Sequence, residues 1–134
     1  MRHLQLLITL LLLVLVQSVF GEQPTNTEPG LIIGSVYCDQ DKNGVCDCEE
    51  NGLQDIHIQI FREHCGGTAL QTLHTDENGE FTIQVNDPGT YFVMVDLEYV
   101  CGGRIPTTTS CQRVELTAGE TVKIPGFGYT VYGQ

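Results

Sequence analysis

The sequence predicts an all-β fold, a β-sandwich of about seven strands. Ile56, Ile58 and Ile60 alternate with polar residues, which is the period-two pattern of a strand with one buried face. Turn-forming sequences separate the other short apolar runs, at the spacing of about 8–12 residues that is typical of sandwiches. After residue 21, no stretch of helical length repeats its apolar residues with a helical period, so helices are not expected.

The expected strands are short runs that are rich in β-branched and aromatic residues. They cover residues 31–38, 55–61, 68–75, 79–85, 90–100, 112–116 and 121–132. Between the third and fourth runs, Asn78-Gly79 is a strong signal for a β-hairpin turn. In the fifth and longest run, Tyr91, Val93 and Val95 share one face.

The N-terminus has the pattern of a secretory signal peptide. Arg2 starts a short positive segment, an apolar run covers residues 4–16, and Val19 and Gly21 supply small residues before a cleavage site. The apolar run is too short for a membrane span. We therefore expect cleavage after residue 21 and a secreted, extracellular protein without a membrane segment.

The remaining chain is expected to form one domain. Residues 22–30 are rich in Pro, Thr and Glu and predict a flexible leader, and residues 31–134 predict a single β-sandwich domain. The net charge is −11, and all acidic residues follow residue 21. So acidic a domain is not expected to bind nucleic acid or an anionic membrane, and a bound cation would offset its self-repulsion.

The most specific motif is an acidic loop at residues 39–50, which matches the calcium-loop pattern D-x-[DN]-x-[DN]-G-x5-E. Ca²⁺ takes six to eight oxygen ligands around a tight turn. The candidate ligands are the side chains of Asp39, Asp41, Asn43, Asp47 and Glu50 and the backbone carbonyl of Val45. Gly44 occupies the sharp turn, where a side chain would clash. The alternative is an Asx-rich surface turn that binds nothing.

The segments that flank this loop indicate what a metal would do. Both flanks have strand patterns rather than amphipathic helices, so the loop joins two β-strands. The opening of a helix pair, which is how calcium sensors work, is therefore not available. A bound ion is expected to be structural.

Four segments, in this order, resemble one known family. They read GSVYCDQDKNGVCDCEENGLQDIHIQIF, TLHTDENGEFTI, DPGTYFVMV and LTAGETVKIPGFGY, and they resemble the B-type repeat (Cna-B-like) of the serine-aspartate-repeat surface proteins over about residues 31–131. The resemblance implies a prealbumin-like (transthyretin- or immunoglobulin-like) β-sandwich. Such modules rigidify extracellular adhesins and stalks, commonly with bound calcium.

The resemblance also assigns residues. It places Asp39, Asp41, Asn43, Asp47 and Glu50 on the metal loop of the family, and Asp76 and Asn78 on a second acidic turn. For the second turn, a plain hairpin turn is the alternative. Related pilin-type domains form a Lys–Asn isopeptide bond between the first and last strands, but residues 31–38 lack Lys and residues 121–132 lack Asn. We therefore expect no such cross-link.

The cysteines predict a disulfide framework, because an even number in a short exported chain favours disulfide bonds. They are Cys38, Cys46, Cys48, Cys65, Cys101 and Cys111. Fifteen pairings are possible, and the sequence does not choose among them. A bond between Cys101 and Cys111 would close the longest irregular loop, and the other four cysteines would then pair among themselves.

No catalytic or zinc motif is recognisable. His57, His64 and His74 are scattered in a way that fits surface residues, and no nucleophile–base set is evident, so an enzyme is not expected. The leading hypothesis is a secreted, calcium-stabilised, disulfide-linked module with a structural or adhesive role, monomeric, with an extracellular protein or matrix component as its partner. The alternative is a small secreted partner-binding protein that uses the 101–111 loop, with Arg104 as its cation, as a recognition surface.

Overall fold

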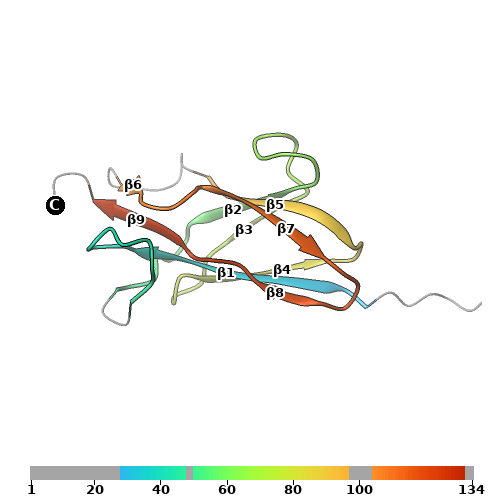
Figure 1. Cartoon of the computed structure of the whole chain (residues 1–134), viewed down its shortest axis with the longest axis horizontal. Helices are drawn as coiled ribbons and strands as arrows, with labels where there is room; N and C mark the ends of the chain where they lie inside the picture. Colours follow the sequence, from blue (N-terminus) through green and yellow to red (C-terminus); the bar gives the residue numbers. More distant parts are fainter. Residues whose placement is uncertain (1–27, 48–49, 97–103, 132–134) are drawn as a thin grey trace, which may run out of the picture.

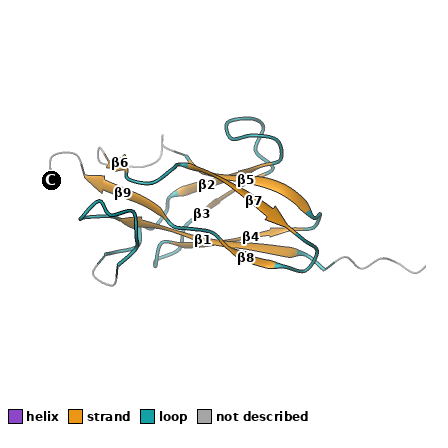
Figure 2. Ribbon diagram, viewed as in Figure 1, coloured by secondary structure: helices purple, strands orange, loops and turns teal. Residues whose placement is uncertain are grey.

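The computed structural model describes residues 28–47, 50–96 and 104–131. This part of the chain contains only strands and loops (Figure 1 and Figure 2). The strands are β1 (Gly30–Cys38), β2 (His57–Phe61), β3 (Gln71–His74), β4 (Glu80–Val85), β5 (Gly89–Val95), β6 (Arg104–Pro106), β7 (Cys111–Leu116), β8 (Thr121–Lys123) and β9 (Phe127–Val131). The signal peptide and most of the leader, which were predicted from the sequence, lie outside the described residues.

The strands form two sheets, and the predicted all-β sandwich is confirmed. One sheet has the order β4-β1-β9-β6, with β8 also paired to β1, and the other has the order β3-β2-β5-β7. β1 runs antiparallel to β4 but parallel to both β8 and β9. The described chain has nine strands rather than about seven for two reasons. The last predicted run is divided at Pro125-Gly126, where proline has no N–H to donate to a ladder, and β6 forms by pairing with β9.

The core lies between the sheets and follows the alternation that the sequence predicts. Tyr91, Val93 and Val95 are all buried, and Ile58 and Ile60 have no exposed surface. A fully buried aliphatic or aromatic side chain contributes about 1.5–3 kcal/mol to the free energy of unfolding. Other large buried side chains come from both sheets, among them Ile32, Val36, Tyr37, Phe61, Phe81, Ile83, Val114, Leu116, Phe127 and Tyr129.

The domain is elongated, and the chain enters and leaves it at opposite ends (Figure 1). β1 begins at one end, and β9 ends at the other, beside the acidic loop that follows β1. Because β1 and β9 are parallel hydrogen-bonded neighbours, a pull on the two ends of the domain would shear their ladder along the strand direction.

One disulfide links Cys65 to Cys111, with a sequence separation of 46 residues. The expected Cys101–Cys111 bond is therefore wrong, and so is the expectation that Cys65 pairs with one of the other three cysteines. The reason is three-dimensional: the loop after β2 folds over β5, which lies between β2 and β7, and so brings Cys65 to the start of β7. Cys38 is half-buried and forms no disulfide with any residue that the structure describes. Cys48 and Cys101 lie outside those residues.

Candidate metal centre

The acidic loop is held at its neck by main-chain hydrogen bonds. The Asp39 N–H donates to the carbonyl oxygen of Tyr129 on β9 (2.8 Å), and the Cys38 N–H donates to Asn51 (2.9 Å). Tyr37 and Gly52, the adjacent residues on the two sides of the neck, form a β-bridge. The loop therefore returns beside β1 before the chain continues to β2 in the other sheet, so that it joins two strands as predicted.

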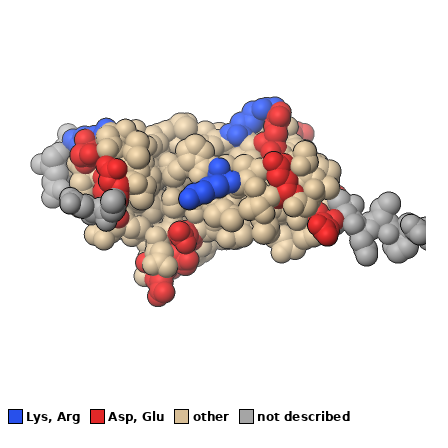
Figure 3. Space-filling view, turned by 60° about the horizontal axis from the view of Figure 1, so that its bottom comes forward, with Lys and Arg blue, Asp and Glu red and all other residues tan. Residues whose placement is uncertain are grey.

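Three carboxylates of the loop converge. Oxygen atoms of Asp39, Asp41 and Glu50 all lie within 4.8 Å of one another, and among the described residues this is the one such group of potential metal ligands. Asp39 is fully buried, Glu50 is half-buried and Asp41 is exposed. Figure 3 shows acidic side chains gathered on the surface at this end of the molecule.

Asp39 organises the turn through both of its oxygens. Its Oδ1 accepts the N–H of Asn43 (3.1 Å), and its Oδ2 accepts the N–H of Gly44 (3.0 Å). Gly44 has a φ of 75°, so the glycine predicted for the sharp turn does adopt the left-handed conformation. Burial raises the pKa of Asp39, but the Thr107 hydroxyl and the loop N–H groups outweigh it, so that the pKa lies below its ordinary value.

Glu50 closes the loop from its other side. Its Oε1 accepts the N–H of Gln40 (2.8 Å), and its Oε2 accepts the N–H of Asp47 (3.1 Å). The Glu50 N–H in turn donates to the Asp47 carbonyl oxygen (3.0 Å). The Glu50 carboxylate therefore links Gln40, near the start of the loop, to Asp47, near its end.

Asn43 lies between two further carboxylates. Its Nδ2 donates to Asp41 Oδ2 (2.9 Å) and to Asp47 Oδ2 (2.8 Å), and its Oδ1 accepts the N–H of Val45 (2.7 Å). The Val45 side chain is exposed. In this arrangement the amide hydrogens of Asn43 occupy the place between the carboxylates of Asp41 and Asp47 to which a cation would be attracted.

The crowded carboxylates contribute to raised pKa values at two groups of this region. At Asp41, the Asn43 N–H lowers the pKa, but desolvation and the carboxylates of Asp39, Glu50 and Asp47 together outweigh it and raise the pKa. Burial and the same negative charges raise the pKa of Tyr37 to about 12. The Tyr37 hydroxyl is buried and has no hydrogen-bond partner among the described residues.

The donor set fits a hard divalent cation. Carboxylate and amide oxygens are the ligands that Ca²⁺ prefers, and their mutual repulsion is relieved when such an ion binds. Asp39, Asp41 and Glu50 are already gathered, whereas Asp47 is held by Asn43. A half-turn of the Asn43 amide would direct its oxygen, rather than its hydrogens, to the same space. The loop residues therefore satisfy the chemistry that the motif requires.

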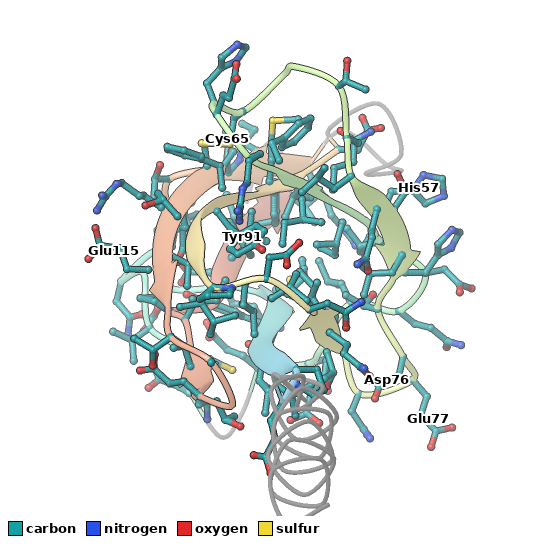
Figure 4. All side chains as sticks on the ribbon, turned by 90° about the vertical axis from the view of Figure 1, so that its right-hand side faces the viewer. His57, Cys65, Asp76, Glu77, Tyr91 and Glu115 are labelled. Atoms are coloured by element: carbon teal, nitrogen blue, oxygen red, sulfur yellow. A yellow bond between two sulfur atoms is a disulfide. The ribbon has the colours of Figure 1, made fainter. Side chains whose placement is uncertain are left out.

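The second acidic turn is built differently. Asp76 Oδ1 accepts the N–H groups of Asn78 and Glu80, both at 2.9 Å, so this carboxylate caps its own turn. Asp76 and Glu77 project from the turn at the edge of the sandwich (Figure 4). The turn forms where the sequence predicts one, but the predicted β-hairpin is wrong, because β3 pairs with β2 in one sheet and β4 pairs with β1 in the other. The turn therefore carries the chain from one sheet to the other. Asp76 belongs to no three-residue group of potential metal ligands in the described part of the chain.

Two contacts between segments that are distant in the sequence were not predicted. Gly79 in the second turn packs against Gly52 at the end of the acidic loop, so closely that neither position has room for a Cβ. His57 on β2 and His74 on β3 lie side by side, with ring centroids 4.1 Å apart. Both contacts depend on strand register, which no local pattern reveals.

The fold, the acidic loop between two strands and the turn beside it are those of a B-type repeat module. The sequence model of the SdrD B-like domain matches residues 31–120, and the chain belongs to this family. The resemblance inferred from the motifs is confirmed.

Curated relatives share the module within much longer proteins. Colossin-A of Dictyostelium discoideum is 36% identical over 83 residues, which is 56% of this chain and 1% of that protein. Serine-aspartate repeat-containing protein I of Staphylococcus saprophyticus is 36% identical over 58 residues, or 43% of this chain and 3% of that protein. Serine-aspartate repeat-containing protein D of Staphylococcus aureus (strain Newman) is 33% identical over 61 residues, or 46% of this chain and 4% of that protein. The chain therefore spans a small fraction of each relative.

Solved structures support the fold alone. GBS52, the minor pilin of Streptococcus agalactiae, superposes with a TM-score of 0.58 at 13% identity, over 80% of this chain and 46% of that chain. The shaft pilin SpaA of Lactobacillus rhamnosus GG gives a TM-score of 0.58 at 11% identity, over 77% of this chain and 51% of that chain. The described residues contain no helix that is long and apolar enough to cross a membrane.

Proposed function

We propose that the protein is a secreted, calcium-stabilised, disulfide-linked β-sandwich module with a structural or adhesive role outside the cell. The observation that carries the proposal is the convergence of Asp39, Asp41 and Glu50 in a loop that joins two strands of an SdrD B-like domain. Asn43, Val45 and Asp47 would complete the ligand set. The module would act as a monomer, with an extracellular protein or matrix component as its partner, and without catalysis.

The position of the loop supports a stiffening role for the ion. Asp39 belongs both to the acidic cluster and, through its N–H, to the ladder between β1 and β9. The chain enters through β1 and leaves through β9 at opposite ends of the domain (Figure 1). An ion that holds Asp39 would therefore stabilise the ladder that bears a pull along the long axis.

Recognition through the 101–111 loop is the weaker alternative. In its described part, the Thr107 N–H donates to the Gly128 carbonyl oxygen (2.8 Å), and the Thr108 hydroxyl accepts the Gly128 N–H (3.0 Å). Arg104 starts β6, opposite Val131. These residues hold β6 and the following turn against β9. This structural role accounts for them without a partner-binding function.

The test is a thermal melt of the protein with Ca²⁺, with Mg²⁺ and with chelator. A ligand that binds only the folded state at 100 times its Kd adds about 2.7 kcal/mol, so the melting temperature should rise clearly with Ca²⁺ and less with Mg²⁺. Glu50→Gln should lose most of this rise. The matched control Glu77→Gln, which removes an exposed carboxylate from the other turn, should keep it. Equal melting temperatures of the wild type in calcium and in chelator would refute the calcium part of the proposal.

A further inference from the structure

His57 and His74 form a pair of imidazoles on the outer surface of the sandwich. They are directly opposite each other in the antiparallel register of β2 and β3. Their ring centroids are 4.1 Å apart, and the ring planes are inclined by 46°. Ile56 and Ile58, the neighbours of His57 in the chain, are buried, so His57 lies on the opposite, outward face (Figure 4). His74 is exposed and His57 is half-buried.

We propose that this pair binds a late first-row divalent transition metal ion, Zn²⁺ above all, at a site separate from the acidic loop. Imidazole nitrogen is a preferred ligand of Zn²⁺, Cu²⁺ and Ni²⁺, whereas Ca²⁺ takes oxygen ligands. The two sites therefore differ in chemistry as well as in position. Among the described histidines, cysteines and carboxylates, the one group of three ligand atoms within 4.8 Å of one another is that of Asp39, Asp41 and Glu50, so the histidine pair is a two-ligand site as the side chains stand.

The distance between the rings suits a shared ion. With Zn–N bonds of about 2.0–2.1 Å, two nitrogens on one tetrahedral ion are roughly 3 Å apart. Rings with centroids 4.1 Å apart are close enough for a nitrogen of each to reach one ion after a small rotation. Because the lone pairs lie in the ring planes, the lone pairs of two parallel stacked rings would not meet, but those of two inclined rings can converge. The rotation that brings them together can take place about χ2, because this torsion is soft in histidine.

The strands hold the two ligands in place before the ion binds. Both residues belong to a hydrogen-bonded ladder, and the four pairs of that ladder run from His57↔His74 to Ile60↔Gln71. The second imidazole is therefore present at a high effective concentration once the first has bound the ion. A single surface histidine such as His64, in the loop after β2, lacks this advantage.

A carboxylate lies in the same row of the sheet. The Asp96 N–H donates to the carbonyl oxygen of His57 (2.9 Å), so Asp96 follows β5 at the position opposite His57. Residues opposite each other in neighbouring antiparallel strands project to the same face, about 4.5–5.5 Å apart at Cβ. As the side chains stand, Asp96 and the two histidines do not form a three-ligand group within 4.8 Å, so the Asp96 side chain would have to rotate to supply a third donor, or an acceptor that orients the His57 ring. The net charge of −11 further favours a cation here.

The test uses the folded wild-type protein with saturating Ca²⁺, which keeps the acidic loop occupied, and titrates it with Zn²⁺. Side-chain ¹H–¹⁵N NMR spectra follow the imidazoles, because thiols also bind Zn²⁺ and would confuse a purely calorimetric result. We expect the His57 and His74 resonances to shift together and saturably, while those of His64 do not. If these resonances stay in place, or if His64 responds equally, the proposal is wrong.

Variants then assign the ligands. His57→Gln and His74→Gln should each weaken Zn²⁺ binding about tenfold or more, because either change removes the chelate. His64→Gln, the matched control, should bind as the wild type does. Asp96→Asn should weaken binding several-fold, and unchanged binding would remove Asp96 from the site. Unchanged affinity in both single histidine variants, with their folds verified by melts without metal, would overturn the proposal.

Discussion

Gly79→Ala is the sharpest test of how the second turn is joined to the acidic loop. Gly79 has a φ of 76°, and a Cβ there would lie 2.6 Å from both the Gly52 Cα and the Leu53 nitrogen and closer still to the Val36 carbonyl oxygen. The Leu53 N–H donates to this same oxygen (2.8 Å), and the Val36 N–H donates to Gly79 (2.8 Å). The new methyl group would therefore push directly on a buried main-chain hydrogen bond.

The expected loss of stability has two parts. A left-handed conformation costs an L-residue about 1–2 kcal/mol, and overpacking against immovable backbone costs typically 1–3 kcal/mol more. Gly79→Ala should thus lower the free energy of unfolding by about 2–5 kcal/mol. The two parts can be separated, because Gly66 has a φ of 85° but no atom within 4 Å of its would-be Cβ. Gly66→Ala should cost only the first part, about 1–2 kcal/mol.

The assay is urea denaturation of both variants and the wild type in chelator, so that metal binding does not contribute. The midpoints should fall for both variants at an unchanged slope, and further for Gly79→Ala. The close contact between the turn and the acidic loop is refuted if the two variants lose the same free energy.

Two further predictions concern the disulfide and the buried carboxylate. For the Cys65–Cys111 bond, whose separation is 46 residues, the chain-entropy relation gives about 4 kcal/mol, so Cys65→Ala/Cys111→Ala should lose roughly that much in urea denaturation. Peptide mapping that found Cys111 joined to Cys101 would contradict the structure. For Asp39, whose pKa is depressed in the folded state, the stabilising contribution is complete above its ordinary pKa of 3.8 and is lost as the pH falls through the lower folded value. Asp39→Asn in calcium-free buffer should therefore show a shallower loss of unfolding free energy below pH 3.8 than the wild type, and identical slopes would contradict this.

The features that the sequence predicts are local ones. β2 and β5 follow from alternation within one strand, and the turn at Asn78-Gly79 follows from two adjacent residues with a known turn preference. That β3 and β4 then join different sheets, rather than pairing as a hairpin, is not encoded in those two residues. The acidic loop is also local, since its metal-binding pattern lies within twelve consecutive residues, and the structure does bring Asp39, Asp41 and Glu50 together. Each of these predictions needs only the geometry of a short stretch of chain.

The features that the sequence does not predict depend on which strands become neighbours. The Cys65–Cys111 bond requires that β5 lie between β2 and β7, and sequence distance favoured the wrong partner. The contact of His57 with His74 requires the β2–β3 register, and a shift of one residue would turn one ring towards the core. β6 is three residues long and exists because β9 offers it a free edge. In each case the determining interaction joins segments whose pairing has no local signature.

Asp39 shows how a local motif gains a role from non-local structure. By pattern alone it is the first residue of an acidic loop, and nothing in that pattern requires it to be buried. In the fold its N–H continues the β1–β9 ladder to Tyr129, while its carboxylate holds the turn at Asn43 and Gly44. Any force that separates β1 from β9 at this end must therefore also disturb the acidic cluster, and any ion bound there resists the separation. Binding of an ion and stiffness would thus be coupled through a single buried residue, which is the physical reason to expect the loop to stiffen the module rather than to switch it.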